Sequence, residues 1–170
     1  DILKVSFSGN IVAKDGTTLQ PFTLEDIKNL LPSVHLIPGR VQAEDYLNAV
    51  GISLETCTDN NGGQNLAYLD PGDYVDYEVL VLNSGMHKVD FRTASQSPGA
   101  LNIQIVDSTG NILSNLGSAN FPATGDWQDW ETYSFNVPLT AGERILRLTI
   151  TQAPFNLNWI EFWFGGIGLN

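Results

Sequence analysis

A repeated alternation of apolar and polar residues is the feature that most restricts the fold of this chain. The segment Tyr74–Val81 shows it most clearly, because apolar side chains fall at every second position and acidic ones lie between them. Strict alternation over four to eight residues is typical of a β-strand with one buried face. The pattern predicts that one face of this strand lies in a core and is made of Val75, Tyr77, Val79 and Val81.

Similar segments recur along the chain from about residue 40, with turn-forming residues between them at Asn83–Gly85 and Ser108–Asn111. Because no helical pattern separates them, they predict an all-β fold, an antiparallel β-sandwich of the jelly-roll type. Tyr46, Tyr77, Trp130 and Trp159 fall in strand contexts and are expected in its core. The expected strands are Val41–Tyr46, Tyr74–Val81, His87–Arg92 (Val89 and Phe91 inward), Leu101–Val106, Gln128–Val137, Arg144–Thr151 and Asn158–Phe164.

Residues 1–39 follow a different pattern. Ile2–Phe7 and Ile11–Ala13 are expected to pair as a small hairpin, and Thr23–Leu31 predicts a short helix that begins at an N-cap threonine and ends before Pro32. We expect residues 1–39 to be an appendage or the tail of a preceding module, and residues 40–170 to form the sandwich. Because the chain starts at Asp1 without a methionine, we expect a fragment of a larger protein.

The charge of the chain excludes some classes of partner. It has 8 Lys and Arg against 19 Asp and Glu, a net charge of -11, which disfavours nucleic acids and anionic membrane surfaces. No apolar run approaches the roughly 20 residues of a membrane span. The single cysteine, Cys57, excludes an internal disulfide and is expected to be a buried small apolar residue. The many acidic oxygens leave calcium open.

Two aromatic residues stand in polar, turn-rich segments where a core would not normally hold them. Trp127 lies in Pro122–Trp130, and Tyr68 lies in Gly62–Asp73. Exposed rings with polar neighbours are suited to sugars, because the C–H faces of a sugar stack on the ring while flanking groups bind its hydroxyls. The plainer alternatives are that Trp127 caps the end of the sandwich and that Tyr68 is a half-buried structural residue.

Four pieces of the sequence together resemble family 6 carbohydrate-binding modules. They are Val41–Tyr46, Asp59–Asn65, Tyr68–Tyr77 and Phe155–Phe162, in the order and spacing of that family over about residues 40–164. The resemblance implies a non-catalytic β-sandwich module, usually tethered to an extracellular bacterial glycoside hydrolase. It also implies a secreted protein, which we expect to be a monomer.

The resemblance implies roles for particular residues. Tyr68 and Trp127 match the two aromatics that enclose one sugar ring in the end loops, and Asn156 matches the asparagine at the base of that site. Glu55 matches a polar residue at its rim. As alternatives, Asn156 is a turn former whose sugar contact falls to Asn158, and Glu55 is a solvated surface carboxylate.

A second site on a sheet face is used by only some family members. Its aromatic position corresponds to Tyr74, where many members have tryptophan. The sequence therefore leaves the activity of this second site open.

A calcium site is also expected. Gln42 and Glu44 share one face of the first expected strand and Glu161 lies on the last, and first and last strands are often neighbours in such sandwiches. Two carboxylates and an amide, completed by backbone carbonyls, suit a cation that takes 6–8 oxygen ligands. The resemblance implies a structural calcium here as well, and the alternative is a surface cluster of hydrogen bonds.

An enzyme and a structural or protein-binding domain are the other classes of function to consider for this chain. A glycoside hydrolase needs two carboxylates across a cleft, and pairs such as Asp70 with Asp73 or Asp126 with Glu55 lack a context that indicates a buried acid. A serine hydrolase is unsupported, since His35 and His87 show no partner. A structural or protein-binding sandwich leaves the loop aromatics without a role. Among polysaccharides we favour β-1,3-glucan of the laminarin type, then agar, then xylan or cellulose.

Overall fold

The computed structural model describes residues 11–12, 18–19, 34–60 and 62–165. The chain divides into two compact units, Asp1–Pro32 and Ser33–Asn170. In the first unit, β1 (Ile11–Val12) pairs antiparallel with β2 (Thr18–Leu19). The segment Ile2–Phe7 and the helix expected over Thr23–Leu31 lie outside the described residues.

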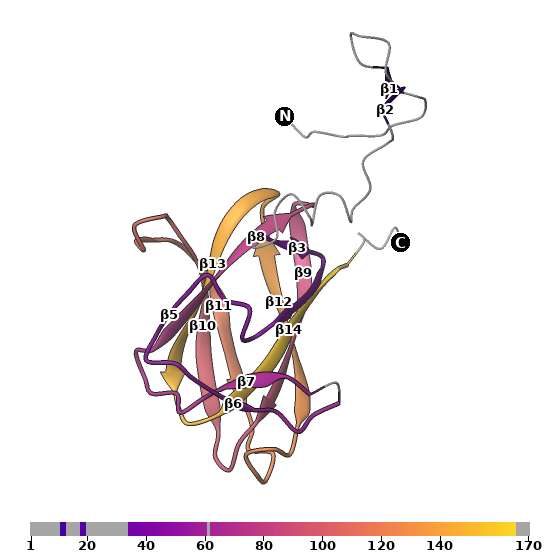
Figure 1. Ribbon diagram of the computed structural model, residues 1–170. Coiled ribbons are helices and arrows are strands. Elements are labelled where there is room, and N and C mark those ends of the chain that lie inside the picture. The colour runs from indigo at the N-terminus through magenta and orange to yellow at the C-terminus, as the bar shows by residue number, and fades with distance from the viewer. Residues whose placement is uncertain (1–10, 13–17, 20–33, 61, 166–170) are drawn as a thin grey trace, which may run out of the picture. The chain divides into compact units, whose positions relative to one another are not determined.

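The second unit is a sandwich of two sheets (Figure 1), which confirms the all-β prediction. One sheet has the order β11-β10-β13-β8-β3, with β5 also on β8, and the other has the order β12-β9-β14-β7-β6, with β4 also on β14. All pairings are antiparallel except that of β3 with β8. The strands are β3 (His35–Ile37), β4 (Gly39–Gln42), β5 (Asn48–Val50), β6 (Ser53–Thr56), β7 (Gln64–Ala67), β8 (Tyr74–Val81), β9 (Gly85–Ala94), β10 (Gly99–Val106), β11 (Ile112–Phe121), β12 (Glu131–Leu139), β13 (Gly142–Gln152) and β14 (Asn156–Phe164).

The sandwich starts a few residues before residue 40, because β3 already pairs with β8. Within the described ranges no helix has the length and apolar content to cross a membrane.

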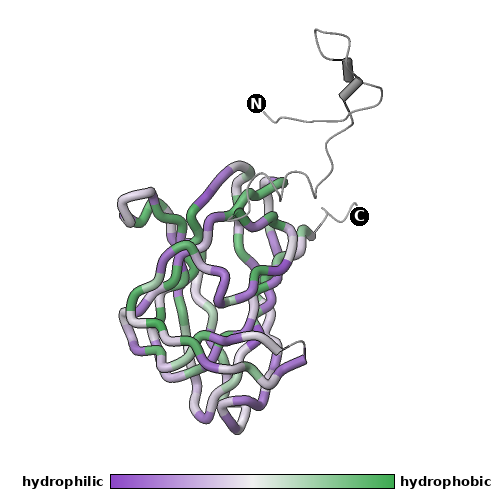
Figure 2. Tube along the Cα trace, viewed as in Figure 1, coloured by the Kyte–Doolittle hydropathy of each residue, from purple (hydrophilic) through white to green (hydrophobic). Residues whose placement is uncertain are grey.

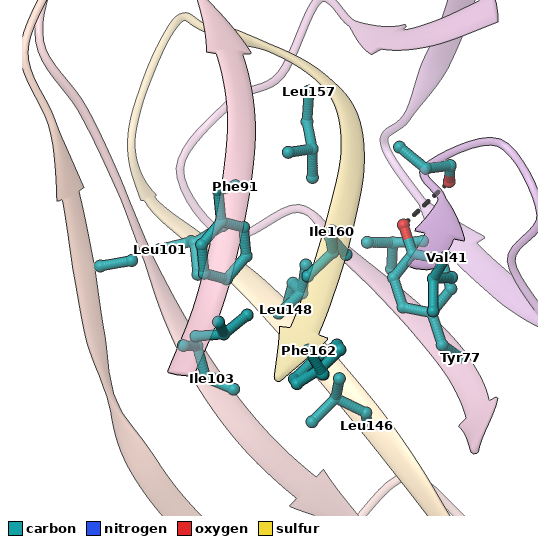
Figure 3. Close-up of a cluster of buried hydrophobic side chains, with 14 of the residues drawn as sticks. Val41, Tyr77, Phe91, Leu101, Ile103, Leu146, Leu148, Leu157, Ile160 and Phe162 are labelled. Carbon is teal, nitrogen blue, oxygen red and sulfur yellow. Dashed lines mark hydrogen bonds between the residues drawn. The ribbon is translucent and has the colours of Figure 1, made fainter. Parts of the chain in front are cut away.

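The core lies between the two sheets, where the inward faces of the strands meet. The valine face predicted for β8 is buried, as are Val89 and Phe91 on β9. Figure 3 shows Phe91, Leu101, Leu148 and Ile160 packed together between the sheets. The Tyr77 hydroxyl is also buried and donates a hydrogen bond to the Ala43 carbonyl at 2.8 Å, drawn as the dashed line in Figure 3. This bond satisfies the one polar atom that the ring carries into the core.

Of the aromatic residues expected in the core, Trp159 was assigned wrongly. Ile160 and Phe162 face inward on β14, so the alternation of the strand turns Trp159 outward, where the Arg40 guanidinium carbon lies 3.9 Å from its ring centroid. Tyr77 is fully buried, and Tyr46 packs partly buried against the core. Trp130 is buried in a small separate cluster with Cys57 and Ala94, so the expectation of a buried cysteine is confirmed.

One end of the sandwich carries a group of loops that comes from distant parts of the chain. In Figure 1, β6, β7 and the loops that follow β9 and β11 lie at the lower end. Figure 2 shows that the tube at this end is largely hydrophilic or neutral in colour, whereas green segments concentrate along the strands above. The Ser95 carbonyl joins two of the loops, since it accepts hydrogen bonds from the backbone N–H groups of Thr124 and Gly125 at 2.9 and 3.0 Å. Polar loops tied together in this way can present side chains to solvent.

Candidate functional site

Tyr68 and Trp127 both lie at this loop end. Tyr68 comes directly after β7 and is 72% exposed, with a backbone φ of 55°. A non-glycine residue in the left-handed region is uncommon and costs free energy, and such conformations concentrate at functional sites. Trp127 lies in the loop before β12, and its backbone N–H donates to Asp126 Oδ1 at 2.7 Å. Its ring is partly exposed.

The two rings line one pocket of about 620 Å³. The sequence predicted four residues for this site, and the structure brings all four into the lining. Thr56, Ala67, Gln128 and Pro154 complete it. Because these residues come from strands and loops far apart in the sequence, the pocket exists only once the sandwich has closed. The four predicted residues are Glu55, Tyr68, Trp127 and Asn156.

A network of hydrogen bonds fixes the base of the pocket. Glu55 Oε1 accepts from Asn156 Nδ2 at 2.6 Å, from Gln128 Nε2 at 3.0 Å and from Asn65 Nδ2 at 3.2 Å. Asn156 Nδ2 also donates to the carbonyl of Trp127 at 2.8 Å, which ties the base to the loop that carries the ring. Asn156 is therefore a buried structural anchor as well as a lining residue. Glu55 is also more than a solvated surface carboxylate, because three amide donors converge on it.

Gln128 is a site residue that the sequence reasoning missed. It was expected at the start of a strand, but β12 begins only at Glu131, so Gln128 belongs to the same loop as Trp127. Its Oε1 accepts from Thr58 N, Thr58 Oγ1 and Trp130 Nε1, and its Nε2 donates to Glu55 and Asn65. The signal available in the sequence was an amide directly beside the loop tryptophan.

Asn158 does not line the pocket, so it cannot replace Asn156 there. It is buried, and its Nδ2 donates to Asp59 Oδ2 at 2.9 Å. Asp59 also receives two hydrogen bonds from Arg92, each at 2.8 Å. The Arg92 guanidinium, which outweighs the opposing effect of burial, lowers the pKa of Asp59 below its usual range. This cluster supports the strands beside the pocket.

The carboxylate pairs considered for hydrolysis have local structural roles. Asp73 Oδ2 accepts from the backbone N–H of Asp70 at 2.8 Å, and Asp126 Oδ1 accepts from Gln96 as well as from Trp127. The two histidines have partners that the sequence did not show. His35 Nε2 lies 2.8 Å from the Asp45 carbonyl, and the buried His87 has Nδ1 3.1 Å from the Gly85 carbonyl. Of the two carboxylate pairs and the two histidines, only Glu55 lines the pocket.

The three residues expected to bind calcium differ in their surroundings. Gln42 is exposed on β4, and Glu161 is engaged by Arg40 in an ion pair of 2.7 Å. Glu44 Oε1 accepts from the backbone N–H of Gln64 at 3.1 Å, whereas Glu44 Oε2 is buried and has no hydrogen-bond partner. A buried carboxylate oxygen without a partner is costly unless a cation or a water satisfies it. The chemistry of Glu44 therefore fits a bound cation. Glu161 fits a cation less well, because Arg40 already pairs with its carboxylate.

On the sheet face around Tyr74, a basic side chain covers the tyrosine ring. The Arg147 guanidinium carbon lies 3.7 Å from the Tyr74 ring centroid. Arg147 is itself held by two hydrogen bonds to Asp76, at 2.7 and 2.8 Å, and these raise the pKa of its guanidinium above the usual value. The hollow beside them measures about 260 Å³. A cation thus lies where a sugar would have to stack.

A further hollow, of about 510 Å³, is lined mainly by aliphatic side chains. These include Ile105, Leu113, Leu116 and Ile145, together with Glu78 and Glu143. No aromatic ring lines it, so it lacks the stacking surface that the loop-end pocket provides.

A β-sandwich whose end loops place two aromatic rings over amide and carboxylate groups has the features of a carbohydrate-binding module. Residues 42–163 match the sequence profile of the family described as carbohydrate binding module (family 6). The match covers most of the chain, and the chain therefore belongs to this family. Modules of this family are non-catalytic, in agreement with the absence of a catalytic pattern in the sequence.

Similar proteins support this assignment. The carbohydrate-binding module of Cellvibrio mixtus lichenase 5A, solved in complex with cellotriose, is 33% identical with a TM-score of 0.70, over 76% of this chain and 98% of that one. A β-1,3-glucan binding family 6 module from Bacillus halodurans is 32% identical with a TM-score of 0.68, over 77% of this chain and 99% of that one. The clotting factor G alpha subunit of Tachypleus tridentatus is 31% identical over 122 residues, 71% of this chain but 18% of that protein. The chain thus spans less than a fifth of that curated relative.

Proposed function

We propose that this module binds a β-1,3-glucan of the laminarin type in the loop-end pocket. One sugar ring lies between Tyr68 and Trp127, with Asn156 and Glu55 beneath it. The observation that carries the proposal is that these four residues, far apart in the sequence, line one pocket. Neither ring belongs to the hydrophobic core, and Tyr68 is 72% exposed, so the packing of the sandwich does not require two aromatic residues at this place.

The base of the pocket supports recognition of hydroxyl groups. The Asn156 side-chain nitrogen is used twice within the protein, by Glu55 and by the Trp127 carbonyl, so its Oδ1 is the atom left to accept a bond from a sugar hydroxyl. Because Asn156 is buried and its amide is held from two sides, its orientation is set before the sugar arrives. A site that is organised in advance loses less freedom on binding.

The choice of β-1,3-glucan has its support in the relatives. A module that is 32% identical binds β-1,3-glucan, while one that is 33% identical was solved with cellotriose, a β-1,4-linked glucan. Agar, xylan and cellulose are the alternatives. The shape of the loops selects among them, because similar aromatic pairs fit any sugar with an apolar face.

We propose that the module also holds a structural calcium, with Glu44 as its principal ligand. Its support is the buried and unpartnered Oε2 of Glu44, to which Gln42 and Glu161 would add oxygen atoms. Calcium would supply the positive charge that this carboxylate lacks. For Glu161 to take part, Arg40 has to release it from their ion pair.

The wider biological role proposed is targeting. The module would bring an attached glycoside hydrolase, encoded in the same polypeptide, to its polysaccharide, in a protein secreted by a bacterium and acting as a monomer. Endo-1,4-beta-xylanase A of Thermoclostridium stercorarium, which is 25% identical to this chain over 18% of its own length, is an enzyme that carries a similar region.

Affinity electrophoresis tests the ligand directly. The protein is run in gels that contain laminarin, agarose-derived galactan, xylan or hydroxyethylcellulose, beside a gel without polysaccharide. Retardation that is strongest in laminarin is the expected result. Stronger retardation in another gel reassigns the ligand, and no retardation in any gel overturns the proposal.

A further inference from the structure

The outer face of the second sheet carries a tryptophan that the loop-end pocket does not use. On β14, Ile160 and Phe162 face inward, so Trp163 faces outward, and it is 48% exposed. Its indole Nε1 donates to Asp90 Oδ2 at 2.9 Å. Since Asp90 belongs to the neighbouring strand β9, the indole is held across two strands. Lys88 Nζ lies 6.0 Å from the ring centroid, much farther than the 3.7 Å between the Arg147 guanidinium carbon and the Tyr74 ring, so much of the indole remains open to solvent.

The group that holds this indole is itself firmly fixed. Asp90 Oδ1 accepts from Ser134 Oγ at 2.5 Å, and Oδ2 also accepts from Lys88 Nζ at 2.9 Å. Burial raises the pKa of Asp90, but the hydrogen bonds from Ser134, Lys88 and Trp163 outweigh burial, and the pKa lies below its usual value. Asp90 is therefore a stable carboxylate anchor. A ring held by such an anchor loses little further freedom when a ligand stacks on it.

The face around Trp163 is balanced in charge, although the whole chain has a net charge of -11. Each basic side chain on it is paired with an acidic one, so a neutral ligand can approach without desolvating an unpaired charge. On the adjoining strand β12, Ser134 and Asn136 are exposed and lie opposite Asp90 and Lys88. Their hydroxyl and amide groups suit sugar hydroxyls. The charge pairs are Lys88 with Asp90, Arg92 with Asp59, and Arg40 with Glu161 as long as Glu161 does not bind the proposed calcium.

We propose that this Trp163 face is a second binding site for a neutral polysaccharide chain. The exposed indole stacks on one sugar ring, and Ser134 and Asn136 bind hydroxyls of the same or the next ring. The site lies on the sheet opposite to that of Tyr74. Only the class of its ligand, a polysaccharide, depends on the proposed function. A chain long enough to reach both the pocket and Trp163 gains by effective concentration, even though a single platform binds weakly alone.

The indole signals in a ¹H–¹⁵N NMR spectrum test this site in isolation. The chain has four tryptophans. The variant Tyr68→Ala/Trp127→Ala removes the loop-end stacking and leaves three indole signals, of which Trp163→Phe identifies one. We expect the Trp163 signal to shift progressively on addition of laminarihexaose, cellohexaose or xylohexaose, while the signal of buried Trp130 stays in place. A Trp163 signal that moves with none of the three overturns the proposal.

Retention on polymer provides a second measurement, with the loop-end pocket intact. We expect Trp163→Ala to reduce retardation in the best gel by about twofold to tenfold while the affinity for a trisaccharide is unchanged. Leu113→Ala, which truncates another exposed apolar side chain, is the matched control. Failure of the proposed function would instead show as unaltered binding in Trp127→Ala. If Trp163→Ala changes the sedimentation behaviour of the free protein, the face contacts a second copy and the proposal is wrong.

Discussion

Tyr68 and Tyr74 lie close together in the sequence, yet the structure gives their rings opposite surroundings. Tyr68 follows a strand in a strained backbone conformation and is open to solvent on a loop. Tyr74 begins the next strand and lies under the guanidinium of Arg147, which Asp76 holds in place. The resemblance to family 6 modules implies an aromatic binding residue at both positions. What separates them is the neighbouring side chain, since a cation already stacked on a ring occupies the place of a sugar.

The comparison shows how the same residue type can be a binding surface or a structural one. Around the loop-end pocket, the polar side chains bond to each other, so the rings stay free. On the sheet face, the guanidinium of Arg147 lies on the Tyr74 ring itself. Substitutions at both sites test whether this difference holds.

The largest effect is expected from Trp127→Ala. Burial of a large aromatic against a ligand contributes about 1.5–3 kcal/mol, and its stacking adds about 0.5–1.5 kcal/mol, so the Kd should rise by roughly 30-fold to 2000-fold. The fold should survive because the ring lies on a loop. Isothermal titration with a laminari-oligosaccharide, beside a melting curve, measures both. Unchanged affinity for every ligand of the wild type would refute the loop-end site.

A somewhat smaller effect is expected from Glu55→Gln. The substitution keeps the shape of the side chain and leaves one oxygen for the three amide donors that converge on Oε1, but it removes the negative charge. A hydrogen bond to a charged group contributes about 1.5–3 kcal/mol, against about 0.5–1.5 kcal/mol for a neutral pair, so the network is weakened. We expect both a weaker affinity and a lower melting temperature, since the same network holds the Trp127 loop. Glu143→Gln removes an exposed carboxylate elsewhere and is the control. An affinity of Glu55→Gln equal to that of the wild type would mean that the base of the pocket does not depend on the charge of Glu55.

Removal of calcium should affect stability and leave the pocket working at room temperature. A ligand present at ten times its Kd stabilises the native state by about 1.4 kcal/mol, which corresponds to a shift in Tm of roughly 3–10 °C for a domain of this size. Melting curves with and without EDTA check this, and Glu44→Gln should give the lower Tm in both. If EDTA leaves the melting curve of the wild type unchanged, there is no structural calcium.

The sequence was sufficient for the parts of this molecule that depend on local pattern. Alternation in Tyr74–Val81 gave the buried face of β8, and the polar context of Tyr68 and Trp127 led to the pocket. The prediction that Trp159 lies in the core was wrong, because Ile160 and Phe162 occupy the inward positions of the alternating strand and turn Trp159 outward. The cover that Arg147 forms over Tyr74 could not be foreseen. It depends on the register between β8 and β13, which places Arg147 opposite Asp76. Neither segment alone determines how two distant strands pair.

The smallest effect on binding is expected from Tyr74→Ala, and it tests the comparison most directly. Because Arg147 covers the ring, the substitution removes no surface that a sugar uses, and the Kd and stoichiometry for a short oligosaccharide should stay within about twofold of the wild type. Stability should fall by about 0.5–1 kcal/mol through loss of the cation–π contact, and Tyr74→Phe, which keeps the ring, should recover most of it. If Tyr74→Ala instead lowers the stoichiometry, or weakens binding as much as Trp127→Ala does, Arg147 must move aside for the sugar. The two tyrosines would then differ only in how readily their rings are uncovered.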